Sequence, residues 1–325
     1  METFRENFKR SYYKFLKRHR FSIRRKTSVG QKKPEGWEGK AWAFIQQLRS
    51  ILLRHAKEAV AANRTAAKAA AATAGETVEI EIEETPVAVT AEELLSVQED
   101  VFKLLYNMDQ TPIQAEMPQE TTIAKTGAKD ARIATGGKEK LRYTVVLSVR
   151  GDGEKVKPRI IYKGTPFVSK KTKKGASTKP GKNTLTYQHM PANRTQFDYP
   201  AGGVGLGVQK ASWCDTTQTD AWLTEEFMRR PGASGFSQPA SILTLDDFKC
   251  HKDEAFQQKL ASKAKTEAVM IPGGLTPVVQ PLDRSINKEF KRGMRAKYTH
   301  WVKDEFDRNG PGKAVAPSRG WWRRG

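Results

Sequence analysis

The stretch Ser241-Ile-Leu-Thr-Leu-Asp-Asp-Phe-Lys-Cys-His251 decides the fold of this chain. Its first part, Ile242 to Leu245, is a short apolar run of residues that favour β-structure, and two carboxylates follow it. This pattern predicts a buried strand. The strand would present Asp246 at its carboxyl end.

Two further carboxylates lie at the ends of other predicted elements. Asp109 closes the stretch Leu104-Leu-Tyr-Asn-Met-Asp109, and Asp283 stands near a predicted helix start in Thr276-Pro-Val-Val-Gln-Pro-Leu-Asp283. Mg²⁺ and Mn²⁺ prefer oxygen ligands, and two such ions about 4 Å apart can bind the attacking and the leaving oxygen of a phosphoryl transfer. Three carboxylates far apart in the sequence therefore predict a divalent-metal site.

Each carboxylate also has an ordinary structural explanation. Asp109 could be a turn residue, and Asp283 could be a helix N-cap that stabilises its helix by about 1 kcal/mol. Asp247 is the neighbour most easily mistaken for Asp246, because adjacent strand residues face opposite sides and only one can enter the site. Glu289 is the alternative third ligand. The ordered set of three favours the site over these explanations.

Two other features have both a functional and an ordinary explanation. His251 could position a phosphate or a water molecule, or it could be a histidine whose hydrogen bonds are satisfied within the fold. The stretch Gly202-Gly-Val-Gly-Leu-Gly207 superficially resembles a phosphate loop, but it lacks the Lys-Ser/Thr ending and the strand-loop-helix context. Glycine for close packing or for a turn is the favoured explanation there.

The charge balance indicates a polyanionic partner, most simply nucleic acid. The 325 residues include 57 Lys and Arg against 36 Asp and Glu, a net charge of +21 with a pI near 9.9. An anionic membrane surface is the competing partner, but no apolar run approaches the roughly 18 residues of a membrane-spanning helix. Cys214 and Cys250 form no metal-type cluster, which favours reduced thiols in the cytosol or nucleus.

Two basic segments are candidate contacts to the DNA backbone. In residues 1–29, aromatic side chains recur at helical spacing with Lys and Arg on the other face, and residues 169–182 form a basic loop with several turn-forming residues. A solvated surface that binds nothing specific is the alternative for both. The candidate DNA-binding residues are Lys17, Arg18, Arg20, Arg24, Arg25, Lys26, Lys170, Lys171, Lys173 and Lys174.

Hydrophobic periodicity predicts alternating helices and strands. Residues 78–84 are predicted to be a short strand or a solvated linker, and residues 308–325 are predicted to be unfolded. Helices are expected over 41–72, 91–106, 219–230, 253–263 and 283–302, and strands over 121–124, 143–149, 158–162, 241–246 and 266–271, with a hairpin turn at 151–153.

Three of these motifs, taken in order, resemble the pogo/Tigger branch of the DDE superfamily transposases, to which centromere-binding protein B is related. They are Tyr106-Asn-Met-Asp-Gln-Thr, the stretch that begins at Ile242, and Val279-Gln-Pro-Leu-Asp. The segment Phe15-Leu-Lys-Arg-His resembles the end of that family's helix-turn-helix DNA-binding region. The sequence departs from the family pattern at Gln110, where Glu is usual, and at Asp247, where Asn is usual.

The resemblance implies an α/β fold, an RNase H-like mixed sheet flanked by helices, with a basic helical amino-terminal segment. Four parts are expected. Residues 1–29 would be a remnant of a helix-turn-helix region, 30–97 a helical and low-complexity linker, 98–305 the DDE endonuclease domain, and 306–325 a disordered tail.

The resemblance also implies that Asp109, Asp246 and Asp283 bind two Mg²⁺ or Mn²⁺ ions and catalyse phosphodiester cleavage and strand transfer on DNA. The expected partner is DNA in the nucleus, with no membrane and no small-molecule substrate, and a homodimer is an open alternative to a monomer. The alternative function is that of a catalytically inactive, transposase-derived DNA-binding protein, motivated by the basic charge beside an incomplete amino-terminal region. A decayed, unstable fragment is a third alternative.

Overall fold

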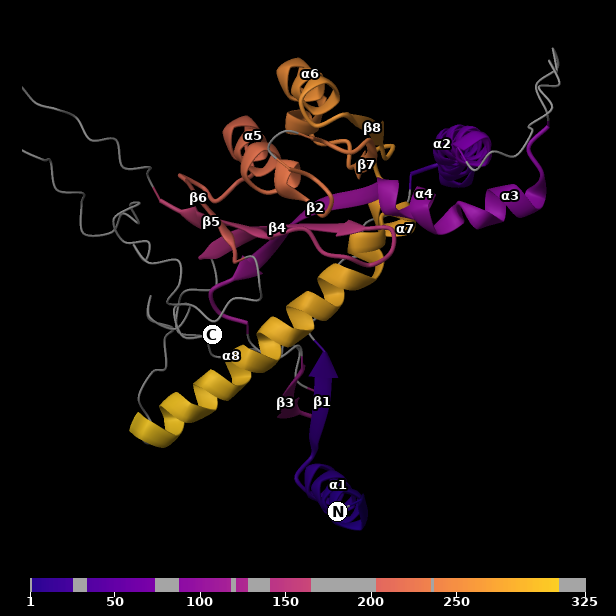
Figure 1. Ribbon diagram of the computed structural model, residues 1–325. Coiled ribbons are helices and arrows are strands. Elements are labelled where there is room, and N and C mark those ends of the chain that lie inside the picture. Colours follow the sequence, from indigo (N-terminus) through magenta and orange to yellow (C-terminus); the bar gives the residue numbers. More distant parts are fainter. Residues whose placement is uncertain are drawn as a thin grey trace, which may run out of the picture. The chain divides into compact units, whose positions relative to one another are not determined.

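The structure is a computed structural model (Figure 1). It describes residues 2–25, 34–73, 88–117, 121–127, 141–164, 203–234 and 237–309. The predictions for residues 78–84 and 169–182, and for the tail beyond 309, lie outside these residues. The chain divides into two compact units, one from 33–112 and 143–288 and the other from 1–32, 113–142 and 289–325.

The larger unit is organised by a six-stranded mixed sheet, as predicted. Strands β2, β7 and β8 pair in parallel, β4 pairs antiparallel with β5 through the predicted hairpin, and β5 pairs in parallel with β6. In spatial order the strands are β6 (Gly205–Gln209), β5 (Arg159–Lys163), β4 (Arg142–Arg150), β2 (Leu105–Gln114), β7 (Ser241–Leu245) and β8 (Thr266–Met270).

Helices pack on both faces of this sheet because every residue of β7 is buried and successive side chains point to opposite sides. Leu243 and Leu245 join a core cluster with Trp222 and Leu223 of α5 (Thr216–Glu225) and with Phe256 and Leu260 of α6 (Glu254–Ser262). Figure 1 shows α5 and α6 together on one side of the sheet.

Ile242 of β7 faces the other way and packs against α2 (Trp37–Thr73). Ala41, Phe44 and Ile51 of that helix share a buried cluster with Ile242 and with Val269 of β8. The helix itself was predicted, but as part of a linker. Its first half contributes to the core, and its second half packs on α3 (Ala91–Ser96) and α4 (Gln98–Leu104).

Short elements complete the larger unit. Two 3₁₀ turns, Phe227–Arg229 and Lys249–Lys252, follow α5 and β7. Helix α7 (Thr276–Val279) leads to a π-helical turn, Leu282–Ile286, and this turn continues into α8 (Asn287–Asn309). The helix therefore extends past residue 306, where the disordered tail was predicted to begin.

The smaller unit contains the amino-terminal basic segment. Helix α1 (Glu2–Arg18) is followed by strand β1 (Phe21–Arg25), which pairs antiparallel with β3 (Thr121–Lys125). The segment after α1, which the family resemblance implied to be the end of a helix-turn-helix region, contains strand β1. The strand at 121–125 was predicted, but it belongs to this two-stranded sheet and not to the six-stranded one.

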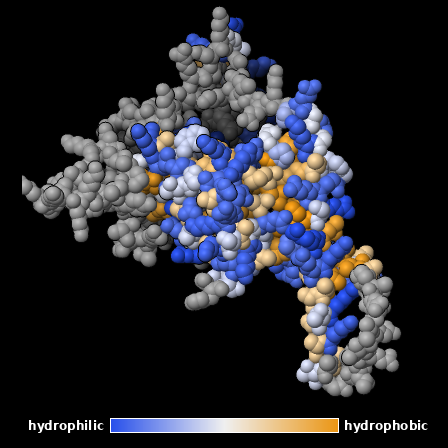
Figure 2. All heavy atoms as spheres, turned by 90° about the horizontal axis from the view of Figure 1, so that it is seen from above, coloured by the Kyte–Doolittle hydropathy of each residue, from blue (hydrophilic) through white to orange (hydrophobic). Residues whose placement is uncertain are grey.

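Hydrophilic residues cover most of the described surface on the face shown in Figure 2. Among the described residues, no helix is long and apolar enough to cross a membrane. This hydrophilic surface is consistent with the 29% of residues in the sequence that are charged.

The glycine-rich stretch is a packing feature, as expected, and not a phosphate loop. A Cβ at Gly205 would overlap the carboxylate of Glu226, and a Cβ at Gly207 would overlap the side-chain amide of Gln218. Glu226 is held by Arg159, whose Nη1 lies 3.0 and 3.2 Å from its two carboxylate oxygens, and both side chains are almost fully buried. Burial raises the pKa of Glu226 to about 7, and Arg159 opposes that shift.

This packing predicts the cost of adding one methyl group at Gly205. Gly205→Ala should displace Glu226 from Arg159 and lower the free energy of unfolding by about 1–3 kcal/mol, because Glu226 is buried and cannot move into solvent. Urea denaturation measures the change. Gly39→Ala is the control, since nothing lies within 4 Å of a Cβ there and Ala favours the helix. Equal stability of Gly205→Ala and wild type would contradict this account.

Candidate active site

Two of the predicted carboxylates come to the same edge of the sheet through the pairing of β2 with β7. The register places Tyr106 beside Leu243 and Asn107 beside Thr244. Asp109 lies two residues further along β2, and Asp246 directly follows the end of β7, two residues after Thr244. Because side chains alternate with a period of two, both are expected on the face shared by Asn107 and Thr244. Because β2 continues to Gln114, Asp109 lies in the middle of its strand, whereas Asp246 stands at the carboxyl end of β7, the usual position of sites in parallel sheets.

The third carboxylate, Asp283, is positioned by two buried amides. Asn107 donates from Nδ2 to Oγ1 and to the main-chain oxygen of Thr244, at 3.0 and 3.1 Å, and its Oδ1 accepts from the main-chain nitrogen of Leu282 at 3.2 Å. Gln280 is fully buried and donates to the main-chain oxygen of Met108 at 3.4 Å. These bonds fix the chain on either side of Pro281 against β2 and β7, and Asp283 follows in the π-helical turn.

A single amide links two of the carboxylates. Nδ2 of Asn287 donates to Oδ2 of Asp109 at 2.5 Å and to Oδ1 of Asp283 at 3.1 Å. Asn287 is 4% exposed. Asp109 and Asp283, which are 174 positions apart in the sequence (109 to 283), are therefore neighbours in the fold.

The electrostatics of the site connect Asp109 to both other carboxylates. The pKa of Asp109 is raised from its ordinary 3.8 to about 7, first by burial and then by the negative charges of Asp283 and Asp246. The hydrogen bond from Asn287 opposes this shift. Burial and like charge both disfavour the ionised form of a carboxyl, so the folded chain holds Asp109 in an unfavourable environment.

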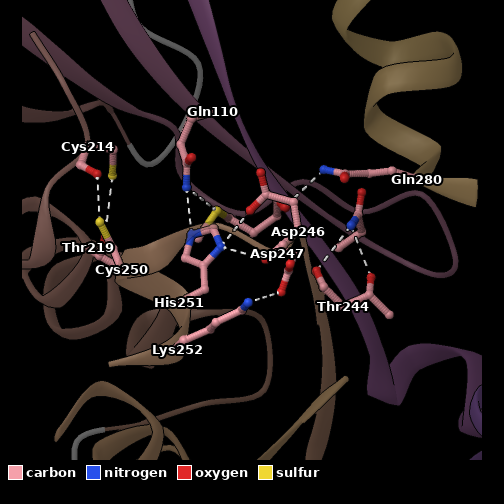
Figure 3. A network of polar contacts seen from close by, with 12 residues as sticks. Gln110, Cys214, Thr219, Thr244, Asp246, Asp247, Cys250, His251, Lys252 and Gln280 are labelled. Carbon is pink, nitrogen blue, oxygen red and sulfur yellow. Dashed lines mark hydrogen bonds and ion pairs between the residues drawn. The ribbon is translucent and has the colours of Figure 1, made fainter. Parts of the chain in front are cut away.

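His251 lies against Asp246 and is fully buried. Its Nδ1 is 2.6 Å from Oδ1 of Asp246 and 3.2 Å from the main-chain oxygen of Asp246, and the second contact is a hydrogen bond. Its Nε2 is 2.8 Å from Nε2 of Gln110 (Figure 3). Because an amide NH₂ can only donate, Nε2 of His251 accepts and Nδ1 carries the proton. His251 is thus a hydrogen-bonded histidine that positions the second carboxylate.

Asp247 stands apart from this group. Its carboxylate forms an ion pair with Lys252, and both side chains are exposed (Figure 3). Glu289 forms an ion pair with Arg292 on the surface of α8. Within the larger unit, the charges of Asp246 and Asp283 raise the pKa of Asp109, and this effect links the three carboxylates predicted from the sequence.

The candidate DNA-binding residues are described in part. Lys17 and Arg18 end α1, Arg20 follows it, and all three are exposed. Arg24 and Arg25 belong to β1. Lys26 and the lysines of residues 169–182 lie outside the described residues.

The site agrees in donor type with a hard divalent cation. Asp109, Asp246 and Asp283 offer oxygen ligands of the kind that such a cation prefers, and Oδ1 of Asp246 lies 2.6 Å from Nδ1 of His251. A bound cation would offset the burial of the Asp109 charge and its repulsion by Asp283 and Asp246. In the part of the chain that the structure describes, however, no three His, Cys, Asp or Glu side chains are already arranged to hold a metal ion.

The amides that build this site were not predicted from the sequence. Asn107 and Gln280 lie within the quoted motifs, but their hydrogen bonds run to residues more than 130 positions away, which no local pattern reveals. Asn287 had a local signal, because it follows Asp283 by four residues at the start of a helix, the spacing at which helical side chains meet.

Comparison with known proteins places the chain in a family. The family described as "DDE superfamily endonuclease" matches residues 140–315, more than half of the chain. "Pogo transposable element with KRAB domain" from Mus musculus is 30% identical over 196 residues, and its Homo sapiens counterpart is 29% identical over the same length. Each match covers 60% of this chain and 27% of the relative, so the chain spans about a quarter of those proteins.

One solved structure also matches, the "Mos1 transposase paired-end complex with left transposon end". It is 10% identical, with 92% of this chain and 77% of that chain covered, and its TM-score is 0.33. A TM-score this low does not support a conclusion about the fold or the site of this chain.

The pKa of Asp109 predicts a pH-dependent stability. A carboxyl with a raised folded-state pKa stabilises the fold fully below its unfolded pKa near 4, and this contribution is lost as the pH rises through about 7. In a chelating buffer the free energy of unfolding should therefore fall between pH 4 and 7.5, with at most about 4 kcal/mol from Asp109.

Asp109→Asn mimics the protonated carboxyl and should remove most of that fall, as measured by urea denaturation at several pH values. Asp247→Asn is the matched control, because it removes a carboxylate that lies outside the group and should leave the wild-type profile in place. A profile of Asp109→Asn with the full wild-type fall would show that Asp109 does not have the raised pKa.

Proposed function

Because the chain belongs to the DDE superfamily endonuclease family, we propose that it is a DNA-binding DDE-type transposase or endonuclease. The proposed reaction is metal-dependent cleavage of a DNA phosphodiester, followed by strand transfer from the freed 3′-hydroxyl. Asp109, Asp246 and Asp283 are the proposed metal ligands and catalytic residues.

The electrostatic influence of Asp246 and Asp283 on Asp109 is the observation that supports this proposal. They come from β2, from the end of β7 and from the turn before α8, and Asp109 responds electrostatically to both others. A purely structural role as turn or cap residues gives no reason to place three like charges together. The arrangement destabilises the metal-free chain, which favours a role that depends on a bound cation.

Two Mg²⁺ or Mn²⁺ ions, held by Asp109, Asp246 and Asp283, would supply Lewis-acid activation of the attacking and leaving oxygens. The chain itself orients the ligands. His251 restrains Asp246 while Gln110 restrains His251, so the second carboxylate keeps one direction. Asn107 and Gln280 hold the backbone before Asp283 against the sheet. Such supporting residues commonly change metal affinity or activity by about 10–100-fold when mutated.

DNA is the proposed partner, and the nucleus is the proposed location. The net charge of +21 favours a polyanion, and Lys17, Arg18 and Arg20 are exposed cations on and after α1. No membrane or small-molecule substrate is part of the proposal, and a homodimer stays open beside a monomer.

A second candidate is a transposase-derived DNA-binding protein without catalysis. One observation favours it: among the described side chains, no group of three potential ligands is already arranged to hold a metal ion. This protein would bind DNA with a strong salt dependence and would not cleave it. Each lost phosphate contact should reduce the slope of log K against log salt by about 0.9.

The deciding experiment is DNA nicking by the whole chain in Mg²⁺ or Mn²⁺. Wild-type protein should nick supercoiled plasmid DNA only when the cation is present, and Asp246→Asn should reduce the rate by at least about 100-fold because a charged ligand is lost. Asp247→Asn should keep the wild-type rate, since Asp247 pairs with Lys252 outside the group.

Cleavage by Asp246→Asn at the wild-type rate would refute the proposed site. Salt-sensitive DNA binding by wild-type protein, with no cleavage in either cation, would favour the second candidate.

A further inference from the structure

The side-chain amide of Asn287 is buried, and only its NH₂ group has hydrogen-bond partners among the described residues. Its NH₂ group lies between Asp109 and Asp283 and donates to both. Its Oδ1 is buried and has no hydrogen-bond partner among the described residues. A buried acceptor without a partner is uncommon in native proteins and costs about 1–3 kcal/mol.

The neighbouring charges explain this orientation. A half-turn of the amide would place Oδ1 against the carboxylates of Asp109 and Asp283, where three oxygens would repel one another. Without a cation, the NH₂ group therefore faces the carboxylates and Oδ1 stays without a partner. The NH₂ group thus contacts the same two carboxylates that a shared cation would bind.

A divalent cation reverses the preference of the amide. An NH₂ group is repelled by the positive charge, whereas an amide carbonyl oxygen is one of the hard ligands that Mg²⁺ and similar ions accept. We propose that Asn287 is an oxygen ligand of the cation held by Asp109 and Asp283, and that it reaches the ion by a half-turn of its side-chain amide. This inference rests on the proposed function.

The backbone around Asn287 is suited to this role. Asp283 and Asn287 are one helical turn apart, so both side chains project from the same face of the π-helical turn and the start of α8. The turn is tied to β2 through the bond between Leu282 and Asn107. Rotation of one amide therefore changes the ligand set without movement of the chain.

A purely structural role for Asn287 predicts the opposite effect on metal binding. If the amide only donates to the carboxylates, it competes with the cation, and its removal should tighten binding. If Oδ1 is a ligand, its removal should weaken binding. The direction of the change in Kd therefore separates the two roles without a measurement of activity.

The test is Mn²⁺ binding to the whole chain, measured by the loss of the free Mn²⁺ signal in electron paramagnetic resonance. Asn287→Leu has a similar size but no ligand oxygen, and its Kd for Mn²⁺ should rise at least about tenfold. Ser285→Ala is the control, because Ser285 lies exposed on the same turn and bonds only to the main-chain oxygen of Pro281 among the described residues. Its Kd should match that of wild type.

Asn287→Asp provides a second measurement if the leucine variant does not fold. Its carboxylate keeps a ligand oxygen and adds a charge, so it should bind Mn²⁺ more tightly than wild type. A Kd of Asn287→Leu equal to or lower than that of wild type would overturn the inference, as would weaker binding by Asn287→Asp. In those cases wild-type Mn²⁺ binding would leave the proposed function standing. If wild-type protein does not bind Mn²⁺, both fail together.

Discussion

The parallel pairing of β2 with β7 is the constraint on which the rest of the site depends. The register that sets Asn107 beside Thr244 also brings Asp109 and Asp246 to one edge on one face. A slip of one residue would turn every side chain of a strand to the other face. Burial of Leu243 and Leu245 on one face and Ile242 on the other makes such a slip costly. The apolar core therefore fixes the positions of the carboxylates.

The fold keeps the carboxylate of Asp109 near those of Asp246 and Asp283, although these like charges repel one another. Asp109 is buried beside two other carboxylates, and one donated amide hydrogen bond from Asn287 offsets only part of that cost. Stability and the proposed function make different demands here, because a core of hydrophobic residues would be more stable but could not bind the proposed cation. The amides that surround the carboxylates keep this conflict confined to one edge of the sheet.

Packing also decided which segments belong to the core. The periodicity of residues 41–72 predicted a helix, yet a helix looks the same in sequence whether it is a linker or covers a sheet. The contact of Phe44 with the Ile242 face settles the question for α2. Likewise, the strand at 121–125 was predicted from its β-branched residues, but only its pairing with β1 shows that it lies outside the main sheet.

The sequence alone predicted most of the helices and strands and singled out the three carboxylates as candidate ligands, because strand alternation, helix periodicity and short motifs act over neighbouring residues. It did not determine how Asp109, Asp246 and Asp283 are held, since Asn107, Gln280 and Asn287 work through hydrogen bonds to residues 137, 172 and 178 positions away. Their partners exist only once the strands have paired. Tertiary structure decided the charge environment of Asp109 for the same reason: burial and like-charge repulsion depend on distance in space and not on separation along the chain.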